Sequence, residues 1–448
     1  MKITLISPKM SLRPMDSEYK RRLSPSLSLL TLAALTPAEH QITIQDENVG
    51  PIRFDQPADL VGVNVNVDTS VRAYAIARRF RERGVPVILG GIHASASPDE
   101  ALDSADAVCI GGAEGVWEQV LADAQNGGLK PRYQKTGPID AAMIPGPRWE
   151  LLDASRYLYT NIVCASRGCC FRCEFCYNSA DYVHPGCRPR PIERVLADIR
   201  RLNTKQVMFI DDNLIGNVAW ARELVHAIAP LGLTWHAAVS TNIGRHLDLL
   251  DAMRSAGCRS LFIGFESING DSVRNANKRQ NNIADYAQII RAIHERGMMV
   301  NASLVLGFDE DGPGVFDKTL AWLIQNKVET MTAHILTPYP GTKLYARLER
   351  EGRIEDRDPS HYNTANVVFT PKRMTKSELY EGYLRMYREF YSFRGIYRRI
   401  PNERQNLIPY LLFNLCYRKF GKLTSACARW GLMRAAGQLA RRLSYGIG

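Results

Sequence analysis

The sequence predicts an α/β protein with a doubly wound parallel sheet, then a partial (β/α)6 barrel, then a mostly helical C-terminal region. Strand-like and helix-like segments alternate over the first 130 residues, and a second alternating series runs from 161 to about 340. Such alternation is typical of βαβ units in parallel sheets. The chain has 448 residues, which leaves room for two or three domains of about 100–200 residues each.

In the first domain, residues 1–130, the strand ends are the expected ligand site. We expect strands at 3–7, 41–45, 60–65, 85–89 and 107–110, with helices at 26–35, 70–83, 98–102 and 114–124. Ligands of doubly wound sheets bind at the carboxyl ends of the strands. Three of these ends are rich in Gly or Asn, which permits a bulky ligand to approach the backbone closely. The alternative is that these glycines only form tight turns.

A linker, a barrel and a helical region are expected to follow. The Gly and Pro content of residues 127–150 indicates a linker, which we place at 131–155. The barrel occupies 156–345, and its strands are expected to end near Arg167, Ile210, Val239, Phe265, Gly307 and Leu336. Active-site residues of such barrels lie at these C-terminal ends. In the region 346–448, Thr375 and Glu378 form a capping box that begins a helix reaching about residue 393. Its apolar residues at helical spacing are expected in the core: Leu379, Tyr383, Met386, Tyr387 and Phe390.

Charge is concentrated at the C-terminus. Residues 372–448 contain 16 Lys and Arg against 4 Asp and Glu, in a chain of net charge +11, so the rest is close to neutral. We therefore expect no nucleic-acid-binding surface on the body of the protein. The tail carries an apolar stripe flanked by arginines, formed by Leu432, Ala436, Leu439, Ala440 and Leu443. A basic amphipathic helix of this kind can lie on an anionic membrane; the alternative is a helix packed on the barrel.

The chain shows no pattern typical of a membrane-spanning or secreted protein. The apolar stretch at 407–417 has 11 residues, whereas a membrane-spanning helix needs about 20. Residues 3–6 form a short strand pattern rather than the longer apolar core of a signal peptide. We expect a cytoplasmic protein, with peripheral contact at the inner membrane face through the basic tail.

The strongest chemical signal is a cluster of cysteines. Cys169, Cys173 and Cys176 have the spacing C-x3-C-x2-C directly after a predicted strand. Three thiolates on one loop can bind three irons of a [4Fe–4S] cluster and leave the fourth iron open to a substrate. The main alternative is zinc, which prefers four ligands in paired spacing. Cys170 is expected to point away, and Cys187 lies too far along the chain to join the loop.

This motif, with Phe175 before the last cysteine, resembles the signature of radical S-adenosylmethionine (SAM) enzymes. The resemblance implies that SAM chelates the open iron, that Phe175 lies near its adenine, and that reduction cleaves SAM to a 5′-deoxyadenosyl radical. The remaining SAM-binding residues that it implies stand after the cysteines or at strand ends: Tyr177, Asp211, Asp212, Asn213, Ser240, Glu266, Ser267 and Leu306. A helix cap is the alternative role for Asp212 or Asn213.

A Rossmann-like domain before such a barrel resembles the cobalamin-binding class of the superfamily. The cobalamin-binding residues that this implies are Ser7, Asn66, Asp68, Thr69, Gly90, Gly91, His93, Gly111, Gly112 and Glu114. The D-x-H-x-x-G motif that provides a histidine ligand to cobalt is missing from the sequence, and His93 lacks that context. Cobalamin is therefore expected to bind without a protein histidine ligand; a degenerate domain that binds nothing is the alternative.

The resemblance favours a cobalamin-dependent C-methyltransferase. Residues 367–375 and the helix after them resemble a subgroup that acts on lipids and small natural products and includes hopanoid methylases. This implies methylation of an unactivated carbon in an apolar or natural-product-like substrate, such as a lipid, isoprenoid or tetrapyrrole. It also implies an external reductant such as flavodoxin or ferredoxin. The alternative uses the same cofactors for ring formation or rearrangement, as in the anaerobic magnesium-protoporphyrin monomethyl ester cyclase.

Two further classes are disfavoured. A methylthiotransferase acting on tRNA would need a second three-cysteine cluster in the first domain, where the sequence has a single cysteine, Cys109. A non-catalytic cobalamin or iron–sulfur sensor would need a closed cluster or an effector domain, and the sequence indicates neither.

Overall fold

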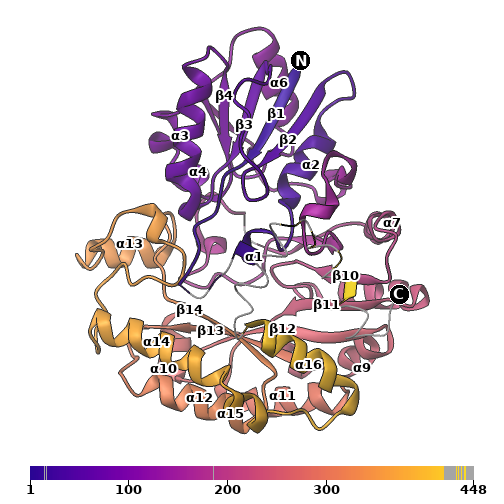
Figure 1. The fold of residues 1–448 in the computed structure, drawn as a ribbon, viewed down its shortest axis with the longest axis vertical. Coiled ribbons are helices and arrows are strands. Elements are labelled where there is room, and N and C mark those ends of the chain that lie inside the picture. The colour runs from indigo at the N-terminus through magenta and orange to yellow at the C-terminus, as the bar shows by residue number, and fades with distance from the viewer. Residues whose placement is uncertain are drawn as a thin grey trace.

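The structure is a computed structural model that describes most of the chain. It covers residues 1–417 except Met15, Ser17 and Pro185, and beyond them Trp430, Leu432, Ala435, Gln438 and Leu439. Figure 1 shows an α/β domain from the first part of the chain above a second sheet, which the C-terminal helices flank. Of the apolar stripe expected in the tail, Ala436, Ala440 and Leu443 lie outside the described residues. No helix in the described part is long and apolar enough to cross a membrane.

The first domain is a six-stranded parallel sheet in the order β2-β1-β3-β4-β5-β6, which confirms the doubly wound prediction. Its strands are β1 (Lys2–Ser7), β2 (Gln41–Asp46), β3 (Leu60–Asn64), β4 (Val87–Gly90), β5 (Ala107–Ile110) and β6 (Arg132–Gln134). Its helices are α1 (Glu18–Arg21), α2 (Leu27–Leu35), α3 (Ser70–Arg81), α4 (Ile92–Ala96), α5 (Pro98–Leu102) and α6 (Trp117–Gln125). Strand β6 lies within the segment expected to be a linker, so this sheet extends beyond residue 130.

The second sheet has six parallel strands in the order β14-β13-β12-β11-β10-β7. These are β7 (Ile162–Val163), β10 (Gln206–Phe209), β11 (Thr234–Val239), β12 (Cys258–Glu266), β13 (Met299–Leu306) and β14 (Thr330–Ile335). The helices between them are α7 (Ile192–Arg201), α8 (Val218–Ile228), α9 (Leu247–Ser255), α10 (Gly270–Asn275), α11 (Tyr286–Glu295) and α12 (Val315–Gln325). The partial (β/α)6 barrel is thus confirmed, with β14 and β7 at its two edges.

The first barrel strand is shorter than expected. Strand β7 ends at Val163, whereas Arg167 was the expected end. Arg167 lies instead in β8 (Ser166–Arg167), which pairs antiparallel with β9 (Arg188–Pro189) in a separate two-stranded sheet. The chain therefore leaves the barrel sheet before it reaches the cysteines.

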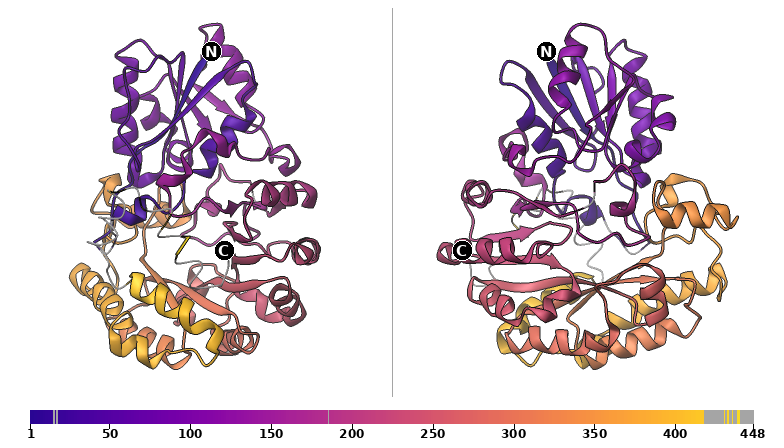
Figure 2. Two further views of the ribbon diagram at one scale, coloured as in Figure 1. Left: turned by 45° about the vertical axis from the view of Figure 1, so that its right-hand side comes forward. Right: turned by 180° about the vertical axis from the view of Figure 1, so that it is seen from behind.

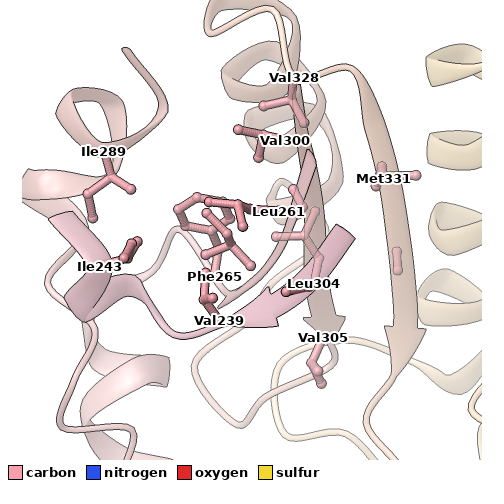
Figure 3. Packing of buried hydrophobic residues seen from close by; sticks show 14 of the residues in the cluster. Val239, Ile243, Leu261, Phe265, Ile289, Val300, Leu304, Val305, Val328 and Met331 are labelled. Atoms are coloured by element: carbon pink, nitrogen blue, oxygen red, sulfur yellow. The ribbon is translucent and has the colours of Figure 1, made fainter. Parts of the chain in front are cut away.

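The strands of the barrel bury one face and leave the other partly open. In β12, Leu261, Ile263 and Phe265 are fully buried against the surrounding helices, whereas Phe262 between them is 37% exposed. Figure 3 shows Leu261 and Phe265 within the packed cluster of apolar side chains. Because successive side chains of a strand point to opposite faces, Phe262 marks the inner face of the barrel sheet.

The C-terminal region covers the β14 edge of the barrel. Its helices are α13 (Lys343–Arg350), α14 (Lys376–Phe390), α15 (Phe393–Arg398) and α16 (Arg404–Tyr417). The predicted capping box is confirmed: Thr375 Oγ1 accepts from the Glu378 amide at 3.1 Å, and Glu378 Oε2 accepts from the Thr375 amide at 2.7 Å. Tyr387 and Tyr391 donate their hydroxyl hydrogens to carbonyl groups of β14, which fixes α14 on that strand.

The carboxyl ends of the first sheet point toward the barrel (Figures 1 and 2). The loops after these strands contact the region around the cysteines. Glu114 forms an ion pair with Arg167 at 3.2 Å, and Tyr182 donates a hydrogen bond to the carbonyl of Ile92 at 3.1 Å. The ligand-binding edges of both parallel sheets therefore lie at one interface.

Candidate active site

The three cysteines of the motif lie on one loop after β8. Cys173 is buried, and Cys169 and Cys176 are half-buried. The loop begins at Gly168, whose φ of +78° is rare for any residue with a side chain. A Cβ atom there would also lie 2.7 Å from the carbonyl oxygen of Gly186. Glycine is therefore required for the turn that leads to Cys169.

The three thiols of the motif are shielded from solvent and lie within electrostatic range of one another. Burial raises the pKa of all three, to about 12 for Cys169 and to about 11 for Cys176. Cys176 interacts electrostatically with both Cys169 and Cys173. In the described residues, no three His, Cys, Asp or Glu side chains are placed to hold a single metal ion. A [4Fe–4S] cluster binds each thiolate to a different iron, so this donor set fits it.

Two other segments hold the cysteine loop in place. The Glu174 amide donates to the Ala276 carbonyl at 2.9 Å, and the Glu174 carbonyl accepts from the Leu344 amide at 3.1 Å. Its carboxylate forms an ion pair with Arg347 at 2.6 Å. Asn277 donates to the carbonyl of Arg172 at 3.1 Å. The loop is thus fixed between α10 and α13.

Two amide side chains donate to the sulfur atoms, and no sequence motif predicts either of them. Gln280 Nε2 lies 3.8 Å from Cys173 Sγ, and Asn178 Nδ2 lies 3.7 Å from Cys176 Sγ. Gln280 Oε1 and Asn178 Oδ1 are buried without a hydrogen-bond partner. Donors to sulfur stabilise the thiolate form that binds iron.

Asp211 was expected near SAM. Its carboxylate is hydrogen-bonded to other groups of the protein. Its carboxylate accepts from the Ala165 amide at 3.2 Å, from the Ser166 hydroxyl at 2.6 Å and from the Ser166 amide. Burial raises the pKa of Asp211 to about 6, although these hydrogen bonds lower it. Asp211 thus ties the segment before the cysteine loop to the end of β10.

The neighbouring polar residues form a second group. Tyr177 donates its hydroxyl hydrogen to Asp212, with oxygen distances of 2.7 and 2.8 Å. Asn213 Oδ1 accepts from the Ser240 amide at 3.0 Å and from its hydroxyl at 3.2 Å. The Asn213 Nδ2 group is buried without a partner. It is therefore a donor available to a bound molecule. Neither Asp212 nor Asn213 caps a helix.

A buried ion pair lies beside the cysteines. Glu266 adopts a positive φ of 62° at the end of β12, and its Oε1 accepts from Lys278 Nζ at 2.6 Å. Burial alone would lower the pKa of Lys278, but Glu266 and then Cys173 and Cys176 raise it. Lys278, which the sequence analysis did not select, therefore remains positively charged next to the thiols.

Apolar residues complete this end of the barrel. Phe175 packs edge-on against Phe308 with ring centroids 5.9 Å apart, and both line a cavity of about 350 Å³. Leu306 is buried in β13 directly before this cavity. Ser267 is buried, and its hydroxyl accepts from the Asn269 amide at 3.0 Å, so it orients the turn after β12.

The strand ends of the first domain carry the residues expected at cobalamin. Asn66 is exposed, and its backbone amide donates to the Thr69 hydroxyl. Asp68 accepts hydrogen bonds from the amide and the hydroxyl of Ser11. Ser7 ends β1, and its carbonyl accepts from the Glu47 amide.

The glycine turns after β4 and β5 shape the same edge. Gly90 ends β4, and Gly91 has φ +111° and passes so close to Val65 that a Cβ would lie 2.8 Å from the Val65 carbonyl oxygen. Gly111 has φ +79°, and a Cβ on Gly112 would meet Ile139 and the Glu114 carboxylate.

His93 does not point out of the domain. Its ring is 1% exposed, Nε2 lies 3.4 Å from Glu100, and Nδ1 is buried without a partner. The ring packs near Tyr74 inside the domain. The expected absence of a histidine ligand to cobalt agrees with this orientation.

Comparison with known proteins identifies the barrel. The model of the radical SAM superfamily matches residues 163–323, which include all three cysteines. The barrel is a radical SAM domain. A domain of unknown function, DUF4070, matches residues 342–434. The radical SAM domain therefore begins at β7, and the C-terminal region has a family of its own.

Relatives that match most of this chain include methyltransferases and a cyclase. Bacteriochlorophyllide d C-12(1)-methyltransferase of Chlorobaculum tepidum is 29% identical over 90% of either chain. Hopanoid C-2 methylase of Rhodopseudomonas palustris is 28% identical, over 76% of this chain and 67% of its own. Anaerobic magnesium-protoporphyrin IX monomethyl ester cyclase of Cereibacter sphaeroides is 25% identical, over 69% and 56%. The chain is thus an enzyme of the radical SAM superfamily with methyltransferases among its homologues.

A solved structure shares the complete fold. The cobalamin-dependent SAM radical enzyme OxsB, with aqua-cobalamin bound, matches with a TM-score of 0.68 and 15% identity, over 98% of this chain and 74% of its own. The match includes the Rossmann-like domain before the radical SAM domain. At this identity it establishes the fold, and the fold agrees with the sequence prediction.

Proposed function

We propose that this protein is a cobalamin-dependent radical SAM C-methyltransferase that acts on an unactivated carbon of an apolar small molecule. The observation that carries the proposal is the C-x3-C-x2-C loop of the radical SAM domain, fixed at the interface with a Rossmann-like domain. The homologues named methyltransferases and methylases support methyl transfer as the reaction.

The residues present suit three cofactors. Cys169, Cys173 and Cys176 would bind a [4Fe–4S] cluster, and Phe175 with Asn213 would contact SAM. Asn66 and the glycine turns after β4 and β5 would contact cobalamin. When bound, the cluster supplies the electron that cleaves SAM to a 5′-deoxyadenosyl radical, and cobalamin supplies the methyl group. The protein orients these groups and excludes water.

The remaining parts of the proposal concern partners and place. An external reductant such as flavodoxin or ferredoxin would supply electrons to the cluster. The protein would work in the cytoplasm, and its basic tail would contact the inner membrane face. A specific observation also favours a second function: a cyclase is among the relatives, so ring formation with the same cofactors is the alternative.

The test is abortive turnover without substrate. The protein is reconstituted without oxygen and given hydroxocobalamin, SAM and a strong reductant. We expect 5′-deoxyadenosine, S-adenosylhomocysteine and the spectrum of methylated cobalamin. Cys173→Ser should abolish 5′-deoxyadenosine formation because a cluster ligand is lost. Cys170→Ser, an exposed neighbour outside the motif, is the matched control and should retain it.

Each other result has a definite meaning. Formation of 5′-deoxyadenosine with bound cobalamin but without S-adenosylhomocysteine would replace the methyltransferase by the cyclase alternative. Failure to form either product with a loaded cluster would refute the catalytic proposal and favour a sensor.

A further inference from the structure

The loop after β1 places a group of polar side chains against the edge of the barrel. Arg13 forms an ion pair with Asp16 at 3.2 Å. Its Nη1 also lies 3.4 Å from Nδ1 of His334 and 3.3 Å from the hydroxyl of Thr364. These residues come from three parts of the chain, since the first loop lies more than 300 positions from β14. We call Arg13, Lys20, His334 and Tyr383 the edge cluster.

The hydrogen bonds fix the proton of His334. Its Nδ1 is 2.9 Å from the Thr364 hydroxyl and also faces the Arg13 guanidinium, which can only donate. The Nδ1 atom is therefore the acceptor, and Nε2 carries the hydrogen. Burial, and then the positive charges of Arg13 and Lys20, lower the pKa of His334 to about 3, so the ring stays neutral. Nε2–H is a donor without a partner among the described residues.

Two further groups of the edge cluster are not satisfied by the protein. Lys20 on α1 is half-buried and has no hydrogen bond or ion pair within the described residues; the nearby carboxylate of Asp16 is already paired with Arg13. Tyr383 on α14 is fully buried beside Arg13, and its hydroxyl lacks a hydrogen bond of regular geometry. A buried cation or hydrogen-bond donor that lacks a partner in the protein favours the binding of an anionic group.

Two carboxylates, Asp16 and Asp68, lie within electrostatic range of the edge cluster. Asp68, on the loop after β3, interacts electrostatically with Arg13, but it accepts two hydrogen bonds from Ser11. Burial raises the pKa of Asp68. Asp16 is paired with Arg13. Among the described residues, no carboxylate forms an ion pair with Lys20.

The inner face of the barrel beside the edge cluster is neutral and becomes apolar toward its centre. His334 and Thr332 face inward on β14, and Thr332 contacts Asn301 of β13 at 3.3 Å. Farther across the sheet, Phe262 is 37% exposed and Ile210 is 42% exposed. Phe262 lies on the central strand β12, and Ile210 directly follows β10. Partly exposed apolar side chains at these positions suit contact with an apolar ligand.

Tyr339 connects this inner face of the barrel with the cysteine loop. Tyr339 follows β14; burial, Asp68 and Cys176 raise the pKa of its hydroxyl, and Arg13 lowers it. One phenol therefore lies within electrostatic range of both the edge cluster and a cluster-binding thiol. A molecule bound between them would span the distance from Lys20 to the radical site.

We propose that the substrate is an amphipathic molecule whose carboxylate binds Lys20, Arg13 and the Nε2–H of His334, while its apolar body lies over Phe262 and Ile210. This inference rests on the proposed function because it assigns the substrate of the same site. Charge-assisted hydrogen bonds give orientation and affinity, and the apolar face positions a carbon near the cysteines.

Two fluorescent probes with the same apolar body test the proposal. The cluster-loaded protein is titrated with 1-pyrenebutyric acid and with 1-pyrenebutanol, and fluorescence anisotropy is measured. We expect tighter binding of the acid by about 10-fold, the size expected for a charge-assisted hydrogen bond. Lys20→Met should remove this preference without weakening the alcohol.

Lys130→Met is the matched control, since its side chain is exposed on the first domain. Equal binding of both probes by the wild-type protein would overturn the proposal, as would a Lys20→Met variant that keeps the preference. The proposal would also be overturned if Lys20→Met abolished the binding of both probes while the variant unfolded at the same temperature as the wild-type protein. The measurement needs no turnover, so a failed methyltransferase assay and a failed binding assay are separate results.

Discussion

Single residues near the cysteines have their charge set by burial. Asp211 has a pKa of about 6 in the folded protein against 3.8 for a free carboxyl group, because burial outweighs its hydrogen bonds. Between these two values the folded chain keeps a proton that the unfolded chain has lost. The free energy of unfolding therefore falls as pH rises from about 4 to about 6, by about 3 kcal/mol for this shift.

We expect Asp211→Asn to reduce this pH dependence. Urea unfolding at pH 5.0 and pH 7.5 would measure it: the wild-type protein should lose more stability over this interval than the variant. Part of the dependence should persist, because burial also raises the pKa of Asp311 to about 6. An identical pH dependence in both proteins would show that Asp211 titrates as it does in the unfolded chain.

At this scale the sequence predicts the ligands but not their surroundings. The spacing of Cys169, Cys173 and Cys176 is local, so it is readable from the sequence. Gln280 donates to a sulfur atom, and Lys278 lies close enough to interact electrostatically with Cys173 and Cys176, because the chain after β12 returns to the cysteine loop. No periodicity or motif marks that return. Asp211 stands where it was expected, yet its oxygens bind backbone and Ser166, which depends on the path after β7.

At the scale of elements, β12 separates a buried face from an open one. Phe265 is fully buried, and Phe262, three residues earlier on the opposite face, is partly exposed. We expect Phe265→Ala to lower the free energy of unfolding by about 3–5 kcal/mol, because it leaves a cavity in the core. Phe262→Ala is the matched variant and should cost less than about 1 kcal/mol. Chemical denaturation measures both. Similar losses for the two variants would mean that the inner face is packed as tightly as the outer one.

The elements that the sequence predicts best are those with a strong internal pattern. The capping box at Thr375 and Glu378 is formed by neighbouring residues, and the structure has it. Strand β6 was not expected because it has three residues and lies in a Gly- and Pro-rich segment. Its place is set by pairing with β5, and by burial of Tyr133, neither of which a short segment reveals.

At the scale of the whole molecule, the sequence predicts the order of the domains but not their contacts. Arg167 and Glu114 are 53 positions apart, and Arg13 and Thr364 are 351 apart. Such pairs depend on the path of the entire chain. The strand ends of each sheet were expected to bind ligands; the structure places the two edges at one interface.

The C-terminal region is joined to the barrel through one buried cation. Arg399 is fully buried and donates to the carbonyls of Val328, Glu329 and Phe390 and to the side chain of Asn414. These acceptors belong to the start of β14, to α14 and to α16. The guanidinium also stacks over the Phe390 ring, 3.4 Å from its centroid. One side chain thus satisfies acceptors from three separate elements.

We expect Arg399→Met to lower the free energy of unfolding by about 3–5 kcal/mol, because several buried acceptors lose their donor at once. Arg398→Met, an exposed neighbour on α15, should change it by less than about 0.5 kcal/mol. Urea unfolding followed by circular dichroism compares the two variants. If the two variants unfold alike, the other contacts of the C-terminal helices, such as the Tyr387 and Tyr391 hydrogen bonds to β14, are sufficient to hold them. A selective loss in Arg399→Met would show that β14, whose carboxyl end carries His334, depends on the C-terminal region for its position.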